Sequence, residues 1–171
     1  DSLTAGAVAS IVVTASSYPY TLRQDAGRPY GAWTNIGVRS FTIDELTARD
    51  STWTDPIPSL IGKPTTLCAW EWYNQKSDGH PGVYNKALAY IAARKAVANQ
   101  RIVWGTSTCY NAADASRVSY NSAMDAAGLV ANNLAQGYVP IHNNSFIGVE
   151  GAYAANPTYY SDTIHMSDIG Y

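Results

Sequence analysis

The sequence predicts an α/β fold built on a parallel β-sheet. Three short apolar runs, Thr65–Trp70, Arg101–Thr106 and Val139–His142, have the length and composition of buried strands. Two longer segments separate them, Val83–Ala98 and a segment that ends at Gln136, and both repeat apolar residues at helical spacing. A helix between successive strands lets the strands run parallel, because the connection crosses back over the sheet. We therefore expect the order strand, helix, strand, helix, strand.

Local signals mark the starts of the first two helices. Thr42 with Glu45 three residues later has the spacing of a capping box, which predicts a short helix that ends near Arg49. Pro81 fits the first turn of the helix that follows the first strand. The apolar residues that this second helix should turn toward the core are Val83, Ala87, Leu88, Ile91 and Ala92.

The last helix is predicted to be long. Asp114 or Ser116 can cap its start, and Gly137 is the expected end. The residues expected on its core-facing side are Val118, Met124, Ala127, Val130 and Leu134.

Composition excludes several classes of protein. The chain has 171 residues, of which 46% are hydrophobic, so it can bury a core and is not intrinsically disordered. Its net charge of -2 excludes a broad basic surface for nucleic acid. No apolar run approaches the length of about 18 residues that a membrane span needs. We expect one domain over residues 1–171.

No cofactor or metal is predicted. His80, His142 and His165 lack the spacing of a metal site, and no glycine-rich phosphate loop occurs. Cys68 and Cys109 are either a disulfide or two buried thiols, and the second is favoured. Few lysines and many tyrosines, asparagines and threonines favour an extracellular or particle-associated protein.

An acid–base pair stands near the end of the chain. Asp162 and His165 lie three residues apart and would share one face of a helical turn. The carboxylate could then accept a hydrogen bond from one imidazole nitrogen and leave the other nitrogen as a base. The same spacing also occurs in ordinary surface turns.

Four blocks of sequence resemble those of the SGNH (GDSL) hydrolases, in the right order and over the whole chain. Asp1–Gly6 resembles the Gly-Asp-Ser-Leu block without its glycine, and Asn35–Thr42 resembles the block Asn-x-Gly-Val-x-Gly-x-Thr. Trp72–Gln75 stands where the Gly-x-Asn-Asp block belongs, just after a strand. Asp162–His165 resembles the last block, Asp-x-x-His.

The resemblance implies a three-layer, flavodoxin-like fold with a parallel central sheet, and a serine esterase without metal or cofactor. Ser2 would be the nucleophile, His165 its base, and Asp162 the residue that orients His165. The oxyanion would be held by the backbone N–H groups of Ser2 and Ser40 and by the side-chain amide of Asn74.

Three positions depart from the family's pattern. Ser40 replaces a glycine and is strained if its φ is positive. Trp72 and Gln75 replace the glycine and the aspartate beside Asn74. We expect Trp72 and Tyr73 to line the substrate pocket, although such aromatic residues more often pack in a core.

The ends of the chain also depart from the family. The nucleophile normally follows a central strand, and the last block normally leads into a closing helix, but the sequence begins at Asp1 and stops at Tyr171. We therefore expect a chain that is incomplete at both ends, or a strand supplied by another segment.

The expected substrate is a short-chain, acetyl-like ester of an alcohol or a carbohydrate. Acyl transfer to a sugar would use the same residues. The alternative is a non-catalytic binding or structural module that retains this fold. No nucleic-acid or membrane-spanning partner is expected.

Overall fold

The computed structural model describes residues 7–8, 11–12, 40–108 and 114–160, and these belong to two compact units. The larger unit consists of Phe41–Ser107 and Asp114–His142. The smaller unit takes in the remainder, including 143–160. Each unit is described by itself below.

A parallel three-stranded sheet forms the centre of the larger unit. Its strands are β3 (Thr65–Ala69), β4 (Gln100–Gly105) and β5 (Gly137–Val139), in the order β3-β4-β5. Both strand pairs are parallel, with Cys68 opposite Val103 and Val103 opposite Gly137. The predicted α/β class and the parallel sheet are confirmed.

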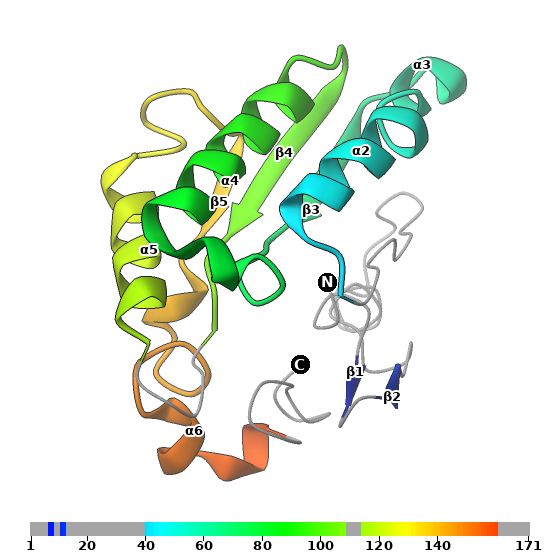
Figure 1. Cartoon of the computed structure of the whole chain (residues 1–171). Helices are drawn as coiled ribbons and strands as arrows, with labels where there is room; N and C mark the ends of the chain where they lie inside the picture. Colours follow the sequence, from blue (N-terminus) through cyan, green and yellow to red (C-terminus); the bar gives the residue numbers. More distant parts are fainter. Residues whose placement is uncertain (1–6, 9–10, 13–39, 109–113, 161–171) are drawn as a thin grey trace. The chain divides into compact units, whose positions relative to one another are not determined.

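Helices cover this sheet in one layer (Figure 1). Helix α4 (Gly79–Lys95) packs on β4 and also contacts α2 (Ile43–Trp53) and α5 (Ala115–Ala126). Shorter helical elements are α3 (Ile57–Ile61), η2 (Lys76–Asp78) and η3 (Ile141–Asn143).

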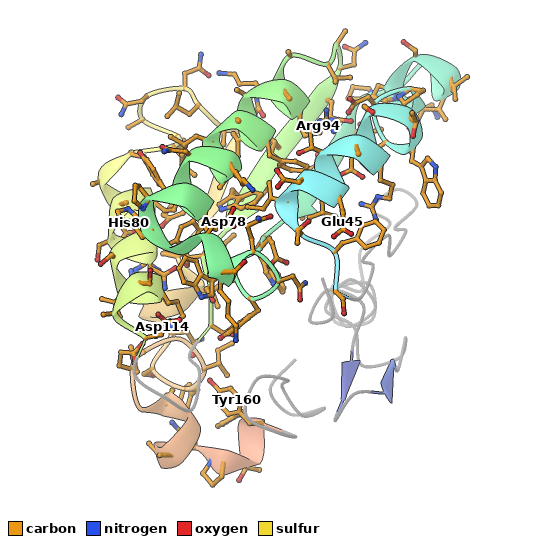
Figure 2. All side chains as sticks on the ribbon, in the orientation of Figure 1. Glu45, Asp78, His80, Arg94, Asp114 and Tyr160 are labelled. Carbon is orange, nitrogen blue, oxygen red and sulfur yellow. The ribbon has the colours of Figure 1, made fainter. Side chains whose placement is uncertain are left out.

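The predicted helix starts are confirmed. Thr42 is the N-cap of α2, and both halves of its capping box with Glu45 are present. Asp114 is the N-cap of α5, where its carboxylate accepts bonds from the backbone N–H groups of Ser116 and Arg117 at 3.0 and 3.1 Å. Figure 2 shows Asp114 at this helix start. These starts depend on side chains within three residues of the cap, which is why sequence alone could locate them.

The expected end of the last helix is wrong. Helix α5 ends at Ala126, and Gly128 follows with a φ of 55° in the left-handed region. Gly137 is instead the first residue of β5. A glycine fits this position because a Cβ there would lie 2.9 Å from Val103 Cγ2. The third strand therefore starts earlier than expected and stops at Val139. Residues expected in the core but exposed in the structure are Val118, Val130, Leu134 and, on α4, Ala92.

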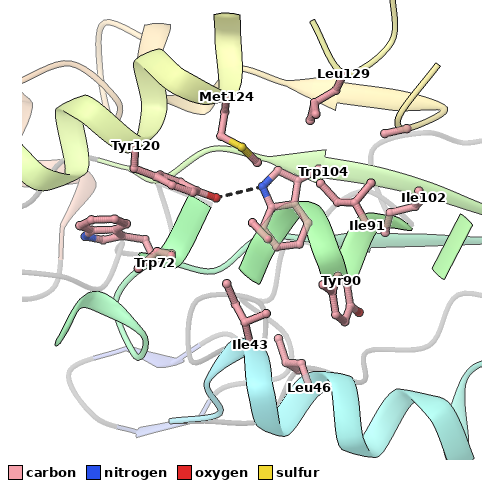
Figure 3. Packing of buried hydrophobic residues seen from close by; sticks show 13 residues of the cluster. Ile43, Leu46, Trp72, Tyr90, Ile91, Ile102, Trp104, Tyr120, Met124 and Leu129 are labelled. Atoms are coloured by element: carbon pink, nitrogen blue, oxygen red, sulfur yellow. Dashed lines mark hydrogen bonds between the residues drawn. The ribbon is translucent and has the colours of Figure 1, made fainter. Parts of the chain in front are cut away.

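The core is built around an indole and a phenol. The Trp104 side chain is fully buried, and its Nε1–H donates to the Tyr120 hydroxyl at 3.0 Å (Figure 3). The ring of Tyr90 lies 5.7 Å from that of Trp104. Ile43 and Leu46 of α2 close the cluster from their side. This bond gives the buried indole N–H of Trp104 an acceptor inside the core.

A buried carboxylate ties α2 to α4. Asp50 is 0% exposed and accepts a bond from the Tyr90 hydroxyl at 2.5 Å, and Arg49 approaches the same carboxylate at 2.6 Å. Burial, together with the negative charge of Asp50, raises the pKa of Tyr90 above its ordinary value.

Tyr90→Phe should therefore lower the free energy of unfolding by about 1–2 kcal/mol, because a buried carboxylate loses a donor. Chemical denaturation measures this change. Tyr84→Phe is the control, since Tyr84 lies on the same helix and its hydroxyl bonds to no described residue. Equal stability of the two variants would show that the Tyr90–Asp50 bond contributes nothing.

The described residues of the smaller unit form short elements. Strands β1 (Ala7–Val8) and β2 (Ile11–Val12) pair antiparallel. Helix α6 (Ala152–Ala155) and η4 (Pro157–Tyr159) precede Tyr160, whose hydroxyl donates to the Ile147 carbonyl at 2.7 Å.

Candidate functional site

Three predicted catalytic residues, Ser2, Asp162 and His165, lie outside the described residues, and their roles stay predictions. The structure does describe Ser40, Trp72, Tyr73 and Asn74. Asn74 follows β3 at its carboxyl end, where the working residues of parallel sheets gather.

Ser40 adopts the left-handed backbone conformation, in which we expected it to be strained. Its φ is 65°, and it stands exposed just before the N-cap of α2. An L-residue pays about 1–2 kcal/mol for this region, whereas glycine enters it freely. Ser40 is therefore strained at a position where a glycine would not be.

The Asn74 side chain is held at both of its N–H groups. Nδ2 donates to the Phe41 carbonyl at 3.0 Å and to Glu71 Oε2 at 3.3 Å. Phe41 lies 33 residues earlier in the chain and directly follows Ser40. The second and third blocks of the family pattern are therefore joined by a hydrogen bond in this structure.

Gln75 makes a second connection between the same segments. Its Oε1 accepts from the backbone N–H of Ile43 at 3.0 Å, and its Nε2 donates to Asp78 Oδ2 at 2.8 Å. The Gln75 amide thus reaches the first turn of α2 and supplies both an acceptor and a donor, whereas an ionised aspartate supplies acceptors alone.

Glu71 is a site residue that the sequence analysis did not single out. Its side chain is 1% exposed, and Oε1 accepts from the backbone N–H of Asn74 at 2.6 Å. Burial raises the pKa of Glu71 to about 7, against the opposing effect of the bonds from Asn74. The available signal was a carboxylate set between two tryptophans, Trp70 and Trp72, at the end of a strand.

The structure corrects the role expected for Trp72. This side chain is 1% exposed, and its ring lies 5.1 Å from that of Tyr120 inside the core (Figure 3). Tyr73 is half-buried and packs against the same cluster. Trp72 therefore packs in the core and does not line a pocket, because its side chain is buried against Tyr120.

A second group of hydrogen-bonded polar side chains lies just after the ends of β4 and β5. His142 Nδ1 lies 2.8 Å from Thr106 Oγ1, and His142 Nε2 lies 3.0 Å from Asp125 Oδ2. Asp125 also accepts from the Tyr138 hydroxyl at 2.5 Å. Hydroxyl, imidazole and carboxylate follow one another as in a catalytic triad, but Thr106 is 0% exposed and no substrate reaches it. We interpret these hydrogen bonds as a structural link, here called the clasp, that joins the ends of β4 and β5 to α5.

Thr106→Val should lower the free energy of unfolding by about 1–2 kcal/mol, because it removes the hydroxyl that bonds to the ring and the backbone N–H of His142. Thermal or urea unfolding measures the loss. Thr66→Val, at an exposed position on β3, is the matched control. A loss no larger than that of the control would contradict the clasp.

Residues 7–8, 11–12, 40–108 and 114–160 hold neither a metal-type cluster nor a membrane-spanning helix. In those ranges no three His, Cys, Asp or Glu side chains cluster as metal ligands would. Nor does any helix there have the length and apolar character needed to cross a membrane. Cys68 is a half-buried free thiol, and Cys109 lies outside the described residues.

Comparisons with protein-family models, with curated proteins and with solved structures find no match to this chain.

Proposed function

We propose that the protein is a serine ester hydrolase with an SGNH-type, flavodoxin-like fold. The substrate would be a short-chain, acetyl-like ester of an alcohol or a carbohydrate. The observation that supports this most is the bond from Asn74 Nδ2 to the Phe41 carbonyl, which joins the second and third blocks of the family pattern. The parallel sheet, with Asn74 at the carboxyl end of β3, is compatible with the same proposal.

The proposed mechanism is acyl transfer through a covalent intermediate. Ser2 Oγ attacks the ester carbonyl carbon while His165 takes the hydroxyl proton, and Asp162 holds the imidazole in position. The tetrahedral oxyanion accepts bonds from the backbone N–H groups of Ser2 and Ser40 and from the Asn74 amide. His165 then gives its proton to the departing alcohol. Water, activated by His165, attacks the acyl-serine and releases the acid.

One observation favours a second candidate, a non-catalytic binding or structural module. Both N–H groups of the Asn74 amide already have acceptors within the protein, Phe41 and Glu71. In such a module Asn74 would only tie two loops together. An enzyme must instead turn one of these N–H groups toward the oxyanion during the reaction.

The deciding experiment is hydrolysis of p-nitrophenyl acetate by the intact protein and by Ser2→Ala. We expect the variant to lose activity by at least about 10³-fold, because the nucleophile is gone. Ser59→Ala, at an exposed serine of α3, is the control and should behave as the parent. Labelling with a fluorophosphonate, located by mass spectrometry, should mark Ser2. Equal rates in the parent and Ser2→Ala would reject the mechanism and favour the module.

A further inference from the structure

We propose that Glu71 is a positioning residue that keeps the NH₂ end of the Asn74 amide, rather than its oxygen, aimed for the oxyanion. The inference rests on the proposed esterase function, in which Asn74 is an oxyanion donor. It goes beyond the family pattern because Glu71 precedes the block that contains Asn74.

The carbonyl and NH₂ ends of an asparagine have the same shape, so its orientation depends on the hydrogen-bonding groups around it. Phe41 O and Glu71 Oε2 are both acceptors, and both face Nδ2. A flipped amide would place its oxygen against two acceptors and would present an acceptor, instead of a donor, to the oxyanion.

The two hydrogen bonds that Asn74 Nδ2 donates differ in length. The bond to Phe41 is 3.0 Å long, while the bond to Glu71 is 3.3 Å. The longer bond is weaker, so the N–H that makes it is the one that can turn to the oxyanion while Phe41 retains the other. Glu71 would thus hold this N–H in the resting enzyme and release it during the reaction.

The carboxyl group of Glu71 occupies a buried position that is energetically unfavourable for its charged form. Glu71 is 1% exposed, and burial of a carboxylate is unfavourable unless its oxygens are bonded. Its oxygens accept from the backbone N–H and the side-chain amide of Asn74, and from the backbone N–H of Gln75. Two of these three bonds come from Asn74, which is explained if the orientation of that residue matters.

Glu71→Gln separates positioning from packing. Glutamine has nearly the same volume, and its carbonyl can still accept from the backbone N–H of Asn74. Its NH₂ group, however, would stand where Glu71 Oε2 accepts, so that one donor faces another. A purely structural Glu71 would show this change in stability alone, whereas a positioning Glu71 would show it in kcat as well.

The experiment compares Glu71→Gln with the parent on p-nitrophenyl acetate. We expect kcat to fall about 10-fold or more with KM unchanged, since only transition-state stabilisation is affected. Glu45→Gln is the matched control, because Gln also serves in a capping box, and its kcat should equal that of the parent. In an Asn74→Ala background, Glu71→Gln should have no further effect on kcat. Unchanged kcat, or effects that multiply in the double variant, would overturn the proposal.

A readout without catalysis separates this inference from the proposed function. In ¹⁵N-labelled protein, the Asn74 side-chain NH₂ signals are identified by their loss in Asn74→Ala. We expect their exchange with water to be slow in the parent and faster in Glu71→Gln. An inactive parent that shows this difference would refute the esterase while leaving Glu71 as the residue that orients Asn74. Identical exchange in both proteins would overturn the positioning role whether or not the parent is active.

Discussion

Asn74→Ala is expected to lower kcat for p-nitrophenyl acetate by about 10²–10³-fold, with little change in KM. Removal of one oxyanion-hole donor has an effect of this size, because the bond forms fully only when negative charge develops on the substrate oxygen. A neutral amide suits the role, since it donates without competing as an acid or base. Steady-state kinetics of the purified variant tests the expectation.

Two controls distinguish a loss of catalysis in Asn74→Ala from a loss of folding. Asn85→Ala changes an exposed asparagine on α4 and should leave kcat unaltered. The melting temperature of Asn74→Ala must also be measured, because the substitution removes the bonds to Phe41 and Glu71. A well-folded Asn74→Ala variant with the kcat of the parent would remove Asn74 from the mechanism.

Local signals in the sequence were sufficient to predict most of the described sheet and its helix starts. The capping box of Thr42 and Glu45 depends on neighbours only, and it forms as expected. The strand predicted from Thr65 is present and loses one residue at its end. A parallel arrangement followed from the helices between strands, because crossover connections dictate it.

The misplaced helix end has a physical reason. Apolar residues continue at helical spacing past Ala126, but Gly128 adopts a positive φ and the chain turns there. Spacing indicates a buried face only while the helix continues, so Val130 is exposed. Gly137 was interpreted as a helix end, whereas close packing on Val103 across the sheet requires a glycine. Contacts between strands cannot be deduced from neighbours in sequence.

The candidate site divides in the same way. Asn74 was singled out because it stands in a block that resembles a family motif and follows a strand, and its role stays a prediction. Glu71 could not, because its importance comes from burial and from its two bonds to Asn74. Trp72 was misinterpreted because an aromatic residue at a strand end has the same sequence signature in a pocket and in a core.

The stability of the parent protein should fall as the pH rises from about 4.5 to about 7. Burial raises the pKa of Glu71 from 4.5 to about 7 in the folded state, while the unfolded chain keeps the ordinary value. Between the two values the unfolded state has lost the proton and the folded state still holds it. The folded state then binds more protons, so the free energy of unfolding decreases with pH and levels off above about 7. A difference of about 2.5 in pKa corresponds to about 3 kcal/mol.

Glu71→Gln should remove this dependence, because glutamine has no proton to lose in that range. Urea unfolding of both proteins at several pH values from 4.5 to 8 measures it, and the difference between their slopes isolates Glu71 from all other titrating groups. At pH 8 the parent carries a buried charge, so its stability advantage over the variant should be smaller than at pH 4.5. Stability that depends on pH equally in both proteins would show that Glu71 titrates at an ordinary pKa. The same measurement bears on catalysis, because a lower kcat in a variant that is no less stable cannot be attributed to unfolding.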